Sequence, residues 1–134
     1  MKFTWIKQNL ERMFDCQITG MAYPYGTYND EVVQILKKCK IQYARSVVFS
    51  GAFKLQKNLL IFKPTCHHAD ENIWELLEKF LKEKSEEKQL FYIWGHSYEF
   101  DVNNNWKRME EILDRLIGHN NIFYGTNREV LLPC

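Results

Sequence analysis

The sequence of 134 residues lacks the patterns that would direct it to a membrane, to nucleic acid or into a disulfide framework. No uninterrupted apolar run approaches the roughly 20 residues that a membrane-spanning helix needs. The formal charge is only +1, whereas binding to phosphates requires a clear positive excess. The four cysteines form no Cys-x-x-Cys pair, and residues 1–9 turn polar before a signal-peptide core can form. We therefore expect a cytoplasmic protein with free thiols that binds neither nucleic acid nor membranes.

The residues that are present predict a folded domain with four amphipathic helices. Hydrophobic residues make up 46% of the chain and aromatic residues 15%, which is too much for a disordered protein. Apolar residues recur at helical spacing in four segments, which are residues 3–14, 32–39, 73–81 and 106–117. Asn29 or Asp30 is the expected cap of the second helix, and Gly118 the expected end of the last.

Five short apolar runs between the helices predict strands at residues 18–23, 41–48, 59–62, 90–94 and 122–124. The alternation of helices and strands predicts an α/β protein with a mainly parallel sheet. In such sheets functional groups gather in the loops that follow the carboxyl ends of the strands. The loops concerned are residues 24–29, 63–68 and 95–101, and they contain three of the four histidines.

Two of these loops suggest parts of a catalytic site. His96 directly follows an apolar strand, so its backbone is held rigidly and its ring can act as a proton donor near neutral pH. Equally, His96 can bond a carbonyl or Glu99 and only tie the loop down. The turn Tyr23-Pro24-Tyr25-Gly26 can aim backbone N–H groups at an oxyanion, or simply connect a strand to a helix.

The third loop, Cys66-His67-His68, offers side chains that bind transition metals. Adjacent residues on an extended chain point in opposite directions, so at most two of the three can share one ion. A further ligand would have to come from elsewhere, with His96 the obvious choice. A cluster of this kind more often holds no metal. Glu99 and Asp101 lie too close on one loop to be a glycosidase pair.

Taken together, these loops resemble motifs of the polysaccharide deacetylases, the NodB-like superfamily that includes chitooligosaccharide deacetylases. Residues 20–28, Gly-Met-Ala-Tyr-Pro-Tyr-Gly-Thr-Tyr, resemble the Arg-x-Pro-Tyr-Gly motif of the family. Residues 91–100, Phe-Tyr-Ile-Trp-Gly-His-Ser-Tyr-Glu-Phe, are similar to its late motif of a strand followed by His. Residues 63–68 and 122–127 are similar to segments of one bacterial branch, and the motif order over residues 9–129 is that of the family.

The resemblance implies a distorted, TIM-barrel-like (β/α) barrel that hydrolyses acetyl groups, on nitrogen or oxygen, from an acetylated oligosaccharide or polysaccharide. In the intact family a divalent metal, for which we expect zinc, activates water against the acetyl carbonyl. By similarity, the N–H of Tyr25 helps to hold the oxyanion and His96 is the general acid. The residues that the resemblance places on the substrate side are Tyr23, Pro24, Gly26 and Tyr98. Aromatic side chains at strand ends, such as those of Tyr23 and Tyr98, are as often part of the core.

The chain also departs from the family pattern in its metal-binding motifs. It has no adjacent Asp pair and no His-x-x-x-His, and Ala22 stands where many members have Arg. We therefore expect residues 1–134 to be a single incomplete domain, the C-terminal part of a deacetylase barrel. It should be inactive and bind no metal alone, with His67 and His68 as the candidate ligands of any rebuilt site. Its open sheet edge predicts self-association or a partner chain. The alternative is a non-catalytic carbohydrate-binding or interaction remnant.

Overall fold

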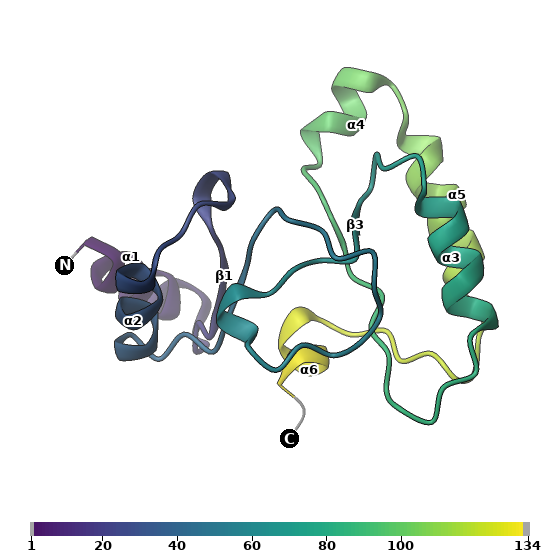
Figure 1. The fold of residues 1–134 in the computed structure, drawn as a ribbon. Coiled ribbons are helices and arrows are strands. Elements are labelled where there is room, and N and C mark those ends of the chain that lie inside the picture. The colour runs from purple at the N-terminus through teal and green to yellow at the C-terminus, as the bar shows by residue number, and fades with distance from the viewer. Residues whose placement is uncertain (1, 133–134) are drawn as a thin grey trace. The chain divides into compact units, whose positions relative to one another are not determined.

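A computed structural model describes residues 2–132, which divide into two compact units (Figure 1). The first unit takes the chain up to Val47, the short segment Lys57–Phe62 and the segment that begins at Tyr124. The second unit takes Val48–Gln56 and Lys63–Phe123. Within residues 2–132, no helix has the length and apolar character needed to cross a membrane.

The first unit holds a two-stranded parallel sheet flanked by helices. Its elements are α1 (Lys2–Phe14), β1 (Gly20–Ala22), the one-turn helix η1 (Pro24–Gly26), α2 (Asp30–Lys38), β2 (Tyr43–Arg45), the one-turn helix η2 (Leu59–Ile61) and α6 (Asn127–Leu131). β1 and β2 pair with Met21 opposite Ala44. The strands predicted at residues 18–23 and 41–48 are therefore confirmed, although both are shorter than the apolar runs that predicted them.

Helix α2 begins and packs as its sequence predicts. The side chain of Asn29 accepts the N–H of Val32 at 2.8 Å, which caps the first turn. Val33 and Leu36, three residues apart on one face, are buried. They form the core of the first unit together with Tyr23, Ile41, Ala44 and Leu60.

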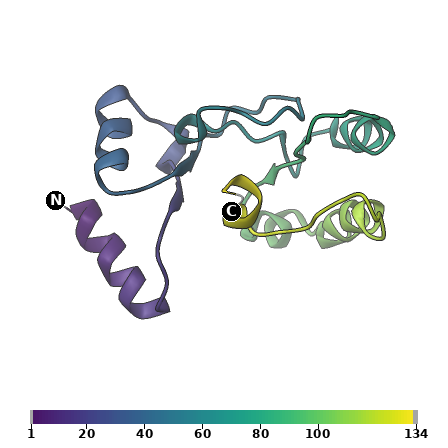
Figure 2. The ribbon, with the colours of Figure 1, turned by 90° about the horizontal axis from the view of Figure 1, so that it is seen from below.

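Helix α1 forms as predicted but does not bury a face within its own unit. None of its described side chains is buried, and Met13 and Phe14 at its end are 75% and 64% exposed. Only Phe3, near the start, packs on the core of the first unit. In Figure 2 the helix diverges from α2 toward its C-terminal end, which accounts for the exposure. The prediction that this helix buries its apolar stripe is therefore wrong for the described structure.

The second unit contains a second parallel strand pair and a pair of neighbouring helices. Its elements are β3 (Cys66–His67), α3 (Ile73–Lys82), β4 (Ile93–Trp94), α4 (Tyr98–Asn103) and α5 (Trp106–Leu116). Helices α3 and α5 lie side by side (Figure 1) and contribute Leu77 and Ile112 to one core, which also contains Cys66 and Ile73. Gly118, just after α5, has a φ of +83°, as expected of the residue that ends a helix.

Three predicted strands differ from the structure. Residues 59–62 form η2 and one isolated parallel bridge at Phe62, because the Asn58 side chain accepts the N–H of Leu60 and closes a tight turn. Residues 122–124 carry no strand. The run 90–94 pairs in parallel only at Ile93–Trp94 and is half-buried, whereas its apolar sequence predicted a strand covered on both faces.

The strands of residues 2–132 form two separate two-stranded sheets and close no barrel. Both pairs are parallel, which confirms the predicted strand direction. Two such pairs are compatible with many α/β arrangements, so the assignment of the chain to part of a (β/α) barrel stays a prediction.

Candidate functional site

The parallel pair β3–β4 brings two of the predicted loops together in the second unit. Cys66 lies opposite Ile93 and His67 opposite Trp94, and the N–H of His68 donates to the carbonyl of Trp94 at 3.0 Å. The carboxyl ends of both strands therefore meet at one edge, as the rule for parallel sheets predicts. Directly beyond that edge lie His68 from one loop and the segment 95–99 from the other.

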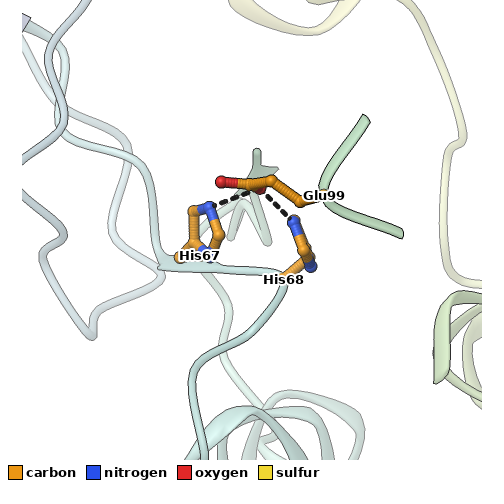
Figure 3. A group of neighbouring side chains, drawn as sticks. All are labelled: His67, His68 and Glu99. Atoms are coloured by element: carbon orange, nitrogen blue, oxygen red, sulfur yellow. Dashed lines mark hydrogen bonds and ion pairs between the residues drawn. The ribbon is translucent and has the colours of Figure 1, made fainter. Parts of the chain in front are cut away.

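One carboxylate collects the polar groups at this edge. Glu99, in the first turn of α4, points its side chain back toward the ends of the strands, between His67 and His68 (Figure 3). Its Oε2 lies 2.5 Å from Nε2 of His68 and 3.2 Å from Nε2 of His67. The same oxygen accepts the backbone N–H of His96 at 3.1 Å. The second oxygen, Oε1, lies 3.5 Å from Nδ1 of His96.

Gly95 makes this close approach possible. A Cβ on Gly95 would lie 2.0 Å from Cδ2 and 2.7 Å from Nε2 of His68, far inside any normal contact. The His68 ring cannot easily give way, because it is only 2% exposed and lies against Phe100, with ring centroids 4.3 Å apart. The glycine between β4 and His96 is therefore required by packing at the carboxylate cluster.

These contacts hold Glu99 in its ionised form. Burial by itself raises the pKa of its carboxyl group. Hydrogen bonds from His68 and from the His96 amide, together with the nearby His67, lower the pKa by a larger amount. The net pKa is about 2. The pKa of His67 is lowered, first by burial and then by the neighbouring His68, while Glu99 acts in the opposite direction. Near neutral pH the cluster is therefore an anionic carboxylate beside an uncharged His67.

The hydrogen bonds also fix where the protons sit on His67. Its Nδ1 accepts the N–H of Ala69 at 3.1 Å, so this nitrogen carries no proton. The neutral ring must then carry its proton on Nε2, the nitrogen that faces Glu99. On His68, Nε2 faces Glu99 while the buried Nδ1 has no hydrogen-bond partner among the described residues.

His67, His68 and Glu99 have the number of ligands expected of a catalytic zinc site, but their surroundings do not fit one. The three candidate ligand atoms lie within 4.8 Å of one another. A histidine that binds zinc through Nε2 usually donates its Nδ1–H to an acceptor. Here Nδ1 of His67 faces a donor, and Nδ1 of His68 faces no partner in the described chain. The N–H groups around Glu99 are arranged to hydrogen-bond a carboxylate rather than to leave ring nitrogens free for a cation. The use of His67 and His68 as metal ligands stays a prediction.

Cys66 does not belong to this polar cluster. It is completely buried in the core of the second unit, against Ile73 and Leu77. Burial, reinforced by the charge of Asp70 and opposed by Arg108, raises the pKa of the thiol to about 12. A thiol that stays protonated at neutral pH is neither a nucleophile nor a ready metal ligand.

His96 and Tyr98 lie at the solvent-exposed side of the cluster. The His96 side chain is 52% exposed, and Tyr98 is 59% exposed. The ring of His96 has two aromatic neighbours, with centroids 5.4 Å from Tyr98 and 5.9 Å from Trp94. An accessible imidazole with a carboxylate on one nitrogen and aromatic rings beside it can transfer a proton to a bound molecule.

The predicted oxyanion turn belongs to the first unit. Tyr25 has a φ of +55° and is 96% exposed, and the amides of Gly26 and Thr27 close the turn on the carbonyls of Tyr23 and Pro24. Gly26 is needed here as well, because a Cβ would lie 2.3 Å from Cγ2 of Val47.

Tyr23 occupies a different environment from the one expected of a substrate-binding residue. Its side chain is 3% exposed, its hydroxyl donates to the carbonyl of Leu60 at 2.7 Å, and its ring stacks on Tyr28. The predicted site residues thus divide between the units. His67, His68, His96 and Tyr98 come together in the second unit, whereas Tyr23, Pro24, Tyr25 and Gly26 are in the first.

Glu99, at the centre of the candidate site, is not among the site residues that the sequence predicts. The sequence suggests it only as a hydrogen-bond partner of His96 or as half of a glycosidase pair with Asp101, which lies too close on one loop. Asp101, the other half, instead accepts the indole N–H of Trp106 at 2.7 Å. The available signal was a Glu three residues after His96 at the start of a helix, the spacing at which a side chain returns to a free backbone N–H.

No family model, curated protein or solved structure matches the chain.

Proposed function

We propose that this chain is the part of a polysaccharide deacetylase-type hydrolase that carries the general acid, and that the hydrolase acts on acetylated sugars. The observation that carries the proposal is His96: a solvent-accessible ring at the carboxyl edge of a parallel strand pair, with Glu99 facing its Nδ1 at 3.5 Å. A general acid in acetyl transfer needs this combination of accessibility and a partner for the second ring nitrogen. The resemblance of the loops to the family motifs supplies the reaction class.

The neighbouring aromatic side chains fit a sugar substrate. Tyr98 is exposed beside His96, and its ring can pack on the apolar face of a pyranose. The role of the Tyr25 amide, in the first unit, as an oxyanion donor stays a prediction of the resemblance alone. The sequence supplies no Asp pair and no His-x-x-x-His to bind the metal that activates water in the family. We therefore expect no turnover by the chain alone.

The test is release of acetate from N-acetylated chitooligosaccharides, measured in the presence of zinc. The chain alone should release none. Addition of a second polypeptide that carries an Asp-Asp and a His-x-x-x-His motif of the family should produce release, and His96→Ala should abolish it. His119→Ala is the matched control, because its ring bonds the Arg115 carbonyl at the end of α5 and is no part of the candidate site. Release by the chain alone, or restored release that survives His96→Ala, would contradict the proposal.

A second candidate is a carbohydrate-binding module without catalysis, and the exposure of Tyr25 and Tyr98 favours it. In this case chitooligosaccharides should bind saturably and perturb the NMR signals of Tyr98, while the complemented mixture releases no acetate. Tyr98→Ala should weaken binding, and Phe123→Ala, which removes another exposed ring of the second unit, should not. Absence of saturable binding would remove this candidate.

A further inference from the structure

The two oxygens of Glu99 have different surroundings, and the difference concerns His96. Oε2 faces three nitrogens: Nε2 of His67, Nε2 of His68 and the backbone N of His96. These contacts fix the carboxylate in one orientation. That orientation leaves Oε1 facing Nδ1 of the His96 ring at 3.5 Å.

An ionised carboxylate only accepts hydrogen bonds, so the nitrogen that faces it must carry a proton. The three contacts on Oε2 keep Glu99 ionised and prevent its side chain from rotating. The favourable neutral form of His96 is therefore the one with the proton on Nδ1. Its Nε2 is then the nitrogen that a ligand or substrate can meet.

We propose that Glu99 is a positioning residue for His96, which fixes the proton on Nδ1 and reserves Nε2 for proton transfer to the leaving group. This assignment rests on the proposed function. His67 and His68 act one step further away, because they hold the carboxylate that holds His96.

The proton transfer is balanced as follows. His96 begins doubly protonated, with Nδ1–H on Glu99 and Nε2–H toward the leaving group. Water has by then added to the acetyl carbon. As the bond from this carbon to the leaving nitrogen or oxygen breaks, the carbonyl of acetate re-forms from the oxyanion's electron pair, while the electron pair of the broken bond stays on the leaving atom, which takes the proton from Nε2. His96 is left neutral, with its proton on Nδ1 and its charge gone. Glu99 remains an ionised carboxylate throughout.

A purely structural role for Glu99 would leave the His96 ring unaffected. Because Glu99 accepts the His96 N–H and its own N–H donates to the His96 carbonyl at 3.1 Å, it also stabilises the start of α4. Helix stability alone therefore cannot distinguish the two roles. The proton position on the ring can, because the protonated and bare nitrogens of imidazole have well-separated ¹⁵N chemical shifts.

The experiment is ¹⁵N NMR of the histidine rings in the folded chain, at a pH where His96 is neutral. In the wild-type protein His96 should carry its proton on Nδ1. The amide of Glu99→Gln has a single acceptor oxygen, and the three N–H groups that face Oε2 in the wild type should take it. Its NH₂ group then faces Nδ1 of His96 as a donor. The His96 proton should then move to Nε2. Asp101→Asn, which removes another carboxylate of α4 bonded to Trp106 instead, should leave the ring unchanged.

A wild-type His96 protonated on Nε2 would overturn the assignment, and so would a folded Glu99→Gln protein that keeps the proton on Nδ1. If Glu99→Gln does not fold, the wild-type spectrum decides alone. The measurement uses no substrate, so its failure is distinct from failure of the proposed function. A correct proton position with no complemented acetate release would leave Glu99 as the partner of His96 but remove the deacetylase assignment.

Discussion

Replacement of Gly95 by Ala tests the packing on which the carboxylate cluster depends. Gly95 separates β4 from His96, and its α-carbon faces the buried ring of His68. The new methyl group would lie 2.0 Å from Cδ2 and 2.7 Å from Nε2 of that ring. Because Nε2 is the atom that bonds Glu99, the clash falls directly on the shortest contact of the cluster.

The expected magnitude follows from these distances. Carbon atoms in contact normally lie about 3.5–4.0 Å apart, so the His68 ring or the Gly95 backbone must retreat by about 1.5 Å. Overpacking of a filled site costs about 1–3 kcal/mol. A retreat of this size also breaks the hydrogen bond to the Glu99 carboxylate, and bonds to charged groups contribute about 1.5–3 kcal/mol. Since the two effects partly overlap, we expect Gly95→Ala to lower the free energy of unfolding by about 2–4 kcal/mol.

The assay is urea denaturation followed by circular dichroism, with Gly51→Ala as the matched control. Gly51 belongs to the same unit and has a φ of +60°, and a Cβ there meets nothing within 4 Å. Its replacement tests only the cost of a left-handed backbone, about 1–2 kcal/mol. If Gly95→Ala loses no more stability than Gly51→Ala, the His68 ring is not held where the structure places it.

Three further predictions concern separate parts of the chain. The pKa of Glu99 is lowered from 4.5 to about 2, so its ionised form stabilises the fold. In urea titrations this stabilisation should be complete above about pH 4.5 and should be lost as the pH falls toward 2. Glu99→Gln should flatten this pH dependence, whereas Asp101→Asn should not. Cys66, which is buried and has a pKa raised to about 12, should resist alkylation at pH 8 until the protein unfolds, whereas the exposed Cys16 should react at once. Equal labelling of both cysteines in the folded protein, measured by mass spectrometry, would contradict this. Asn29→Ala should lower the free energy of unfolding by about 1 kcal/mol through loss of the α2 cap. Asn29→Asp can still accept the Val32 N–H and should therefore keep most of this stabilisation. Equal losses in the two variants would show that the cap is not the cause.

The helices could be predicted because their information is local. In α2 and α3 the apolar side chains recur at helical spacing, and the buried residues Leu36 and Leu77 fall on the predicted stripes. In α5 the helix is where the spacing predicts it, but its buried residue, Ile112, lies beside the predicted stripe, and Leu113 on that stripe is 52% exposed. Helix α6 is too short to show a stripe. Its signal was a capping box, in which Thr126 and Glu129 bond each other's backbone N–H, three residues apart.

The strands were predicted less well because pairing is not local. Residues 59–62 are as apolar as those of a strand, but Asn58 closes a turn at Leu60 and leaves only Phe62 to bridge Arg45. Residues 90–94 look like a long buried strand, yet their partner β3 is only two residues long. An apolar run shows that a segment can pair, and the length of its partner decides how much of it does.

The candidate site lies between these two cases. The loops after β3 and β4 meet because the two strands are parallel, as the rule for parallel sheets predicted from the sequence. The histidines in both loops marked this edge as the candidate site. That Glu99 lies at the centre depends on the register: with His67 opposite Trp94, the backbone after β4 turns at Gly95 directly over the His68 ring. A shift of one residue would exchange the faces of the strand side chains and move the glycine away from that ring. The same two-residue pairing therefore sets both the approach that Gly95 permits and the orientation of the carboxylate that faces His96. Changes in β3 that disturb the pairing should consequently alter the proton position on the His96 ring, even though no residue of β3 lies next to it in the sequence.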